Sequence, residues 1–160
     1  MGCWGPGLFE NDTVWDDLCQ FYPNNLESHP IDILEDIEEL LTADDEEEMN
    51  ILAAIWAVGF YNRGIPFEES QHDILLGNNP TEIINEQIKK NHHIWHKMES
   101  KQFDGLDIYQ YCLRTITNIL NHTTSENWNS PDTWKIWFNN VSQLKQDLQK
   151  IVDDRKVINQ

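Results

Sequence analysis

The chain has 160 residues, of which 39% are hydrophobic and seven are tryptophan, so it is long enough and apolar enough to form a folded domain with one core. Its formal net charge of −17 is uneven, because the first 62 residues carry fifteen carboxylates and no lysine or arginine. An acidic surface repels nucleic acid and anionic membranes, so we expect neither as a partner, and no apolar run approaches the roughly 18 residues of a membrane span.

Residues 1–12 combine glycines with large aromatic side chains in the order Met-Gly-Cys-Trp-Gly-Pro-Gly-Leu-Phe-Glu-Asn-Asp. Pro6-Gly7 suits a type II turn, and Trp4 and Phe9 are placed to anchor the segment in the core. A phosphate-binding loop is disfavoured, because no Lys-Ser/Thr pair follows the glycines and acidic residues follow instead. We therefore expect a structural plug ahead of the first helix.

The pattern Met-Gly-x-Trp-Gly-x-Gly-x-Phe-Glu-Asn-Asp resembles the opening of a bacterial domain-of-unknown-function family, number 4259. The resemblance is concentrated in residues 1–18 and continues weakly at residues 53–57 and in the last helix around Trp134. Cys3 and residues 13–15 depart from the family pattern. The resemblance implies a small, acidic, helical protein of the bacterial cytoplasm, and it transfers no catalytic residues.

Six stretches of the chain repeat apolar residues at three- and four-residue spacing, which is typical of amphipathic helices. They span residues 14–22, 33–41, 49–60, 84–98, 106–120 and 134–151. No stretch of useful length alternates polar and apolar residues with a period of two, so strands are not expected. We predict an all-α fold, a single compact helical domain over residues 1–160 with about six amphipathic helices and the N-terminal plug.

Local signals mark several expected boundaries. Residues 64–80 are the least regular, and we expect a long loop there with a short helical turn at 74–76. Pro80 suits the first position of the helix that follows this loop. The Asp-Gly pair at 104–105 suits a turn between two helices, and Ser130 with the proline after it suits the start of the last helix.

Acidic residues dominate the second expected helix and the connection to the third. Those on the helix recur at i, i+3, i+4 and i+7, so they share one face, and five consecutive acids follow at 44–48. A helix start explains two or three acids of this run, and a solvated face usually mixes both signs of charge. The exclusion of cations over 62 residues instead favours a surface that attracts a basic protein. The predicted partner-binding residues are Asp32, Glu35, Asp36, Glu39, Asp44, Asp45, Glu46, Glu47 and Glu48.

The strongest metal-site pattern is His92, His96 and Glu99, which recur at i, i+4 and i+7 on one helical face. Two histidines and a carboxylate are zinc ligands, so these residues are weak candidates for a metal site. The sequence lacks His-Glu-x-x-His, however, and a solvent-exposed histidine-rich turn is the preferred interpretation. Cys112 lies on an apolar stripe and is interpreted as a core thiol. We expect no catalytic residue, no metal and no cofactor.

These features favour a cytoplasmic protein-binding module over an enzyme. The leading hypothesis is an immunity protein that binds and occludes a cationic, co-encoded bacterial toxin, for example a nuclease. Toxins that act on nucleic acid commonly have basic active sites, which an acidic surface can cover. The alternatives are a housekeeping interaction or regulatory protein and, less favoured, a metal-dependent enzyme.

Overall fold

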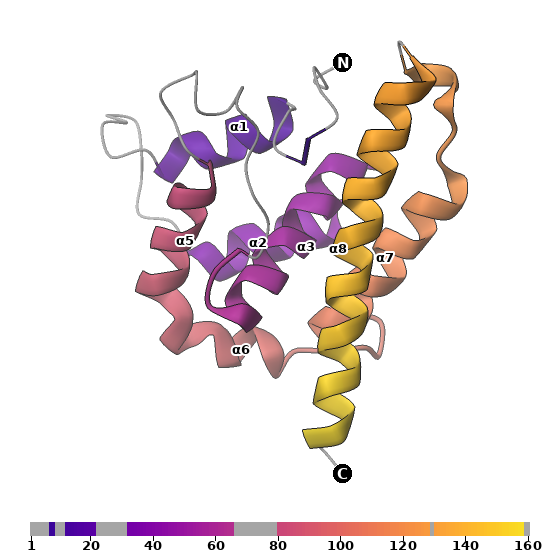
Figure 1. The fold of residues 1–160 in the computed structure, drawn as a ribbon. Helices are drawn as coiled ribbons and strands as arrows, with labels where there is room; N and C mark the ends of the chain where they lie inside the picture. The colour runs from indigo at the N-terminus through magenta and orange to yellow at the C-terminus, as the bar shows by residue number, and fades with distance from the viewer. Residues whose placement is uncertain (1–6, 9–11, 22–31, 66–79, 129, 159–160) are drawn as a thin grey trace.

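The structure is a computed structural model, and it describes residues 7–8, 12–21, 32–65, 80–128 and 130–158. Within these residues the chain forms helices and no β-strand, which confirms the all-α prediction (Figure 1). The α-helices are α1 (Asp12–Leu18), α2 (Ile33–Thr42), α3 (Glu47–Asn62), α5 (Pro80–Asn91), α6 (Trp95–Glu99), α7 (Ile108–His122) and α8 (Pro131–Ile158). Short 3₁₀ turns lie at Cys19–Phe21, His92–Ile94 and Ser125–Asn127.

Two predicted features lie mostly outside the described residues. Of the N-terminal plug, the structure describes Gly7 and Leu8 but not Trp4 or Phe9, and Leu8 packs against the core. The helical turn expected at 74–76 also lies outside the described residues.

Helix α3 is the centre of the fold and contacts α1, α2, α5, α7 and α8. Every residue from Ile51 to Phe60 is buried, including the large side chain of Trp56. The sequence pattern predicted an apolar stripe on one face, but this part of α3 is apolar on all sides. A helix of that composition is stable only when other helices surround it, which the observed packing provides.

Gly59 allows α5 to approach the central helix closely. A Cβ atom at this position would lie 2.7 Å from Cδ1 of Ile88, a buried side chain of α5. The glycine does not end α3, which continues to Asn62. Arg63 is the C-cap of α3, and its left-handed φ of 60° allows the next amide, that of Gly64, to donate to the carbonyl of Gly59 over 2.8 Å.

The stretch expected to form one helix over 84–98 is divided into α5, a 3₁₀ turn at His92–Ile94 and α6. The last residue of α5, Asn91, uses its side-chain amide to donate to the carbonyl of Gln87 over 2.9 Å. Hydrogen bonds of this kind compete with the regular helical ladder, which is consistent with a break at this residue. The buried face is nevertheless retained on both sides of the break, as the burial of Ile88 and Trp95 shows.

Helices α7 and α8 pack side by side and cover one side of α3 (Figure 1). Helix α7 begins with a capping box in which Asp107 accepts from the amide of Gln110 over 2.9 Å and the Gln110 side chain accepts from the amide of Asp107. Helix α8 begins as predicted, because Ser130 Oγ accepts from the amide of Thr133 over 3.1 Å.

Candidate functional site

The exposed face of α2 carries three of the predicted acidic residues. Asp32 is the N-cap, and its carboxylate accepts a hydrogen bond from the amide of Leu34 over 3.0 Å. Glu35 and Glu39 are exposed one helical turn apart. The opposite face of α2 is buried against the core, so its packing orients these carboxylates toward solvent.

Asp36 is placed differently from the other acids of α2, because its carboxyl group faces Asp17 of α1 and its Oδ2 atom is buried. Desolvation by burial, and next the charge of Asp36, raise the pKa of Asp17 to about 8. Burial also raises the pKa of Asp36. At neutral pH a proton is therefore held between the two carboxyl groups. Asp36 belongs to this pair and adds little to the exposed acidic face.

The remaining predicted acids form the connection between α2 and α3. Asp44 and Asp45 lie in the turn, Glu46 takes the N-cap position, and Glu47 and Glu48 occupy the first turn of α3, where the helix dipole stabilises negative charge. Burial, followed by the neighbouring charge of Glu48, raises the pKa of Glu47.

Asn50 holds this connection in place. Its side-chain amide donates to the carbonyls of Leu40, Leu41 and Ala43 over 2.9, 3.3 and 3.1 Å. These carbonyls belong to the end of α2, where the helix itself supplies no donors. Asp45 adopts a left-handed conformation with φ of 59°, which aspartate tolerates better than most residues. The acidic turn is therefore a fixed element of the structure.

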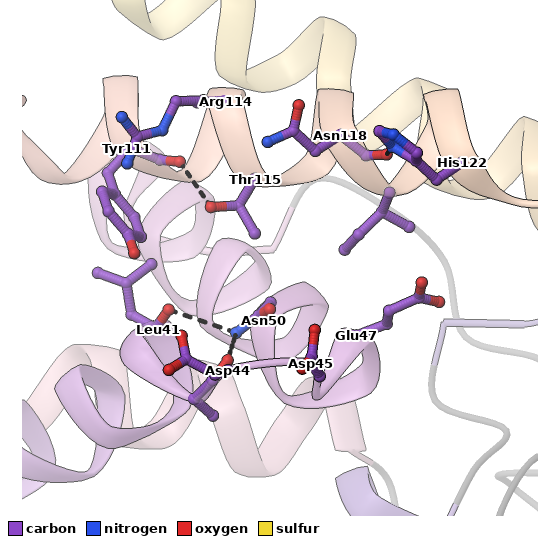
Figure 2. A pocket seen from close by; sticks show the side chains of 12 residues that line it. Leu41, Asp44, Asp45, Glu47, Asn50, Tyr111, Arg114, Thr115, Asn118 and His122 are labelled. Atoms are coloured by element: carbon purple, nitrogen blue, oxygen red, sulfur yellow. Dashed lines mark hydrogen bonds between the residues drawn. The ribbon is translucent and has the colours of Figure 1, made fainter.

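A groove of about 580 Å³ separates this turn from α7 (Figure 2). One wall is formed by the end of α2, the turn and the start of α3, through Leu41, Ala43, Asp44, Asp45, Glu47 and Asn50. The other wall is formed by one face of α7, through Tyr111, Arg114, Thr115, Asn118, Ile119 and His122.

The two walls differ in their chemistry. Three carboxylates lie on the turn side, whereas the α7 side carries two hydroxyls, an amide, an imidazole and the guanidinium of Arg114 (Figure 2). Thr115 Oγ1 donates to the carbonyl of Tyr111 over 3.0 Å, and His122 Nδ1 lies 2.8 Å from the carbonyl of Asn118. The exposed amide of Asn118 can both donate and accept hydrogen bonds.

Arg114 lines the groove but is not paired with its carboxylates. Its Nη1 atom lies 2.9 Å from Oδ2 of Asp104, and its guanidinium lies over the ring of Tyr111 at 4.9 Å from the centroid. Asp104 is presented by the predicted Asp-Gly turn, in which Asp104 and Gly105 both have positive φ. The turn thus holds the arginine away from the acidic wall.

The ion pairs among the described residues involve few of the acids of α2 and the α2–α3 turn. All eleven lysines and arginines of the chain lie within the described residues. Of the ion pairs formed there, only Lys101 with Glu38, over 3.3 Å, joins a cation to an acid of the first 62 residues. Glu38 is not among the predicted binding residues. The exposed acids of α2 and of the turn remain without a cationic partner in the part of the chain that the structure describes.

The structure does not bring the weak metal candidates together as ligands. Oε2 of Glu99 accepts hydrogen bonds from the hydroxyl of Tyr109 over 2.8 Å and from Arg155 over 3.1 Å, so it links α6 to α7 and α8. His92 and His96 are exposed, and His96 Nδ1 lies 3.0 Å from the carbonyl of its neighbour His93. Within the described ranges, no group of three or more His, Cys, Asp or Glu side chains is arranged to hold a metal ion.

Cys112 is buried on the core-facing side of α7, as its position on the apolar stripe predicted. Burial raises the pKa of its thiol well above the usual range, so the thiolate is not formed at neutral pH. This placement supports a packing role for Cys112.

Sequence reasoning missed the α7 wall of the groove. Its residues at 111, 115, 118 and 122 recur at helical spacing opposite the apolar stripe, so their common face was readable from the sequence. The periodicity could not predict which part of the chain lies opposite this face. Only the packing of α7 on α3 brings it opposite the acidic turn.

Comparisons with protein-family models, with curated proteins and with solved structures each give no match to this chain. The resemblance of the first residues to family 4259 therefore stays a prediction. Among the helices that the structure describes, none combines the length and the apolar character that crossing a bilayer requires.

Proposed function

We propose that this protein is a cytoplasmic binding module for a cationic protein, and that its partner is a bacterial toxin which it neutralises by occlusion. The observation that carries the proposal is the group of exposed carboxylates on α2 and the α2–α3 turn, which no cation of the chain compensates within the described residues. A surface held at this charge density attracts a basic partner over several ångströms and accelerates its encounter.

The toxin assignment rests on chemical complementarity. An enzyme that cleaves nucleic acid needs a basic surface to bind phosphates, and an acidic module can occupy that surface in place of the substrate. The rigid presentation of the acidic turn by Asn50 supports this mode, because a preorganised surface loses less conformational entropy on binding.

The proposal is tested by measuring how the protein binds the product of the neighbouring toxin gene at low salt. We expect Glu35→Lys with Glu39→Lys to slow association at least tenfold, because steering depends on the charges of this face. The matched control is Glu126→Lys with Asp154→Lys, which changes the net charge equally at exposed positions outside α2 and the turn. The control is expected to keep most of the association rate.

Growth of cells that express the toxin provides the functional readout. The wild-type protein and the control variant are expected to restore growth, and the α2 variant is expected to restore it less. Equal association rates for the two variants, at 20 mM salt and with unchanged circular dichroism, would rule out the acidic face as the binding surface. Absence of binding by the wild type to any basic protein of its host would reject the proposed function itself.

A further inference from the structure

We propose that the groove between the α2–α3 turn and α7 holds a short extended segment of the cationic partner, with a lysine or arginine side chain against the acidic wall and main-chain groups at Asn118. This inference rests on the proposed function. It adds a location and a mode of recognition that surface charge alone does not specify.

The size of the groove suits a short segment. Its volume of about 580 Å³ lies within the range of roughly 300–1,000 Å³ that is typical of ligand sites, and it exceeds what a single side chain fills. The groove is not an enclosed cavity, so a loop of a larger protein can enter it from solvent.

The acidic wall selects for positive charge. Asp44, Asp45 and Glu47 line the same side of the groove, and none of them forms an ion pair with a described residue. Three carboxylates in one wall repel phosphates and carboxylates, so nucleotides and acidic peptides are poor occupants. An apolar occupant would also find little apolar surface to contact, because Leu41 and Ile119 are the main apolar side chains of a mostly polar lining.

The opposite wall supplies what a peptide backbone needs. Asn118 is exposed, and an amide side chain offers a donor and an acceptor to the N–H and C=O groups of an extended chain. Arg114 is kept from crossing the groove by its ion pair with Asp104 and its contact with Tyr111. The carboxylates therefore remain available to a cation that enters from outside.

The experiment uses the full chain and a capped tetra-arginine peptide, with a capped tetra-glutamate peptide as the charge control, at 20 mM salt. Binding is measured by calorimetry and by amide chemical shifts of the ¹⁵N-labelled protein. We expect the largest shifts at residues 44–47 and 115–118, and no binding of tetra-glutamate. Asn118→Ala is expected to lower the affinity for the arginine peptide about fivefold, which is the effect of losing one hydrogen bond.

Two matched variants separate recognition by the groove from attraction by net charge. Asn121→Ala removes an exposed amide from the same helix outside the groove lining, and it is expected to leave the affinity unchanged. Asp45→Asn keeps a residue that tolerates the left-handed conformation, and it is expected to weaken binding at least threefold more than Asp154→Asn, an equal charge change on α8.

The outcomes distinguish this inference from the function on which it rests. If tetra-arginine binds but Asn118→Ala behaves like Asn121→Ala and the shifts fall on α2, the groove is not the site and the proposed function stands. If tetra-arginine does not bind the folded protein at low salt, both are rejected.

Discussion

The carboxyl pair of Asp17 and Asp36 makes the stability of this protein depend on pH at the scale of single residues. Burial is the main cause that raises the pKa of both groups, and the pKa of Asp17 reaches about 8. An aspartate in the unfolded chain has a pKa of about 3.9. Between about pH 4 and pH 8 the folded chain therefore binds more protons than the unfolded chain, and the free energy of unfolding decreases as pH rises.

Replacing Asp17 with asparagine removes the larger part of this pH dependence, that of the group whose pKa reaches about 8, and supplies an N–H donor to Asp36. We expect Asp17→Asn to raise the free energy of unfolding at pH 8 by a few kcal/mol over the wild type, and to change it much less at pH 4.5. Urea unfolding followed by tryptophan fluorescence at both pH values measures the difference. Asp154→Asn, at an exposed position of α8, is the control and is expected to follow the wild-type profile. A wild-type profile for Asp17→Asn would contradict the shared proton.

At the scale of elements, the packing of α3 against α5 depends on the absence of a side chain at Gly59. Gly59→Ala places a Cβ atom 2.7 Å from Cδ1 of Ile88, which must move although it is buried. Overpacking typically costs 1–3 kcal/mol, and the better helix propensity of alanine returns about 1 kcal/mol, so we expect a net loss of about 1 kcal/mol.

Ile88→Val tests this explanation, because valine lacks the Cδ1 atom that the new methyl group would meet. Alone, Ile88→Val is expected to cost about 1 kcal/mol by leaving a small cavity. In combination with Gly59→Ala it is expected to cost less than the sum of the two single changes, as measured by thermal unfolding. Additive losses would show that the strain at Gly59 is relieved in another way.

The same scale shows what the sequence could predict. The starts of α5 at Pro80 and of α8 after Ser130 were predictable, because a cap or a first-turn proline is encoded by neighbouring residues. The break after Asn91 and the full burial of α3 were not, because they depend on which helices pack together. The same holds for the groove. The residues of each wall could be grouped from the sequence, but the approach of the two walls depends on how the helices pack.

At the scale of the whole molecule, the charge asymmetry of the sequence persists in the folded state. The seven described α-helices form the core together. Among the described residues, however, the ion pair of Lys101 with Glu38 is the one ion pair that joins a cation to the acidic first 62 residues. A net charge of −17 acts against compaction through self-repulsion. Raising the salt concentration from 10 to 300 mM is therefore expected to raise the unfolding free energy, because the Debye length becomes shorter.

Glu39 and Glu86 allow this repulsion to be measured at matched positions. Glu39 is exposed four residues after Glu35, a like charge, whereas Glu86 is exposed four residues before Lys90, with which it pairs over 3.6 Å. At 10 mM salt we expect Glu39→Gln to raise the free energy of unfolding by about 0.2–0.5 kcal/mol and Glu86→Gln to lower it by a similar amount. Both effects should shrink at 500 mM salt, because both charges are exposed. If Glu39→Gln raises the free energy of unfolding, the Glu39 carboxylate lowers the stability of the fold. This is the result that the partner-binding proposal predicts. If Glu39→Gln lowers the free energy of unfolding, Glu39 stabilises the fold. The exposed acids of α2 would then have a structural explanation, which would contradict the main argument for a binding function.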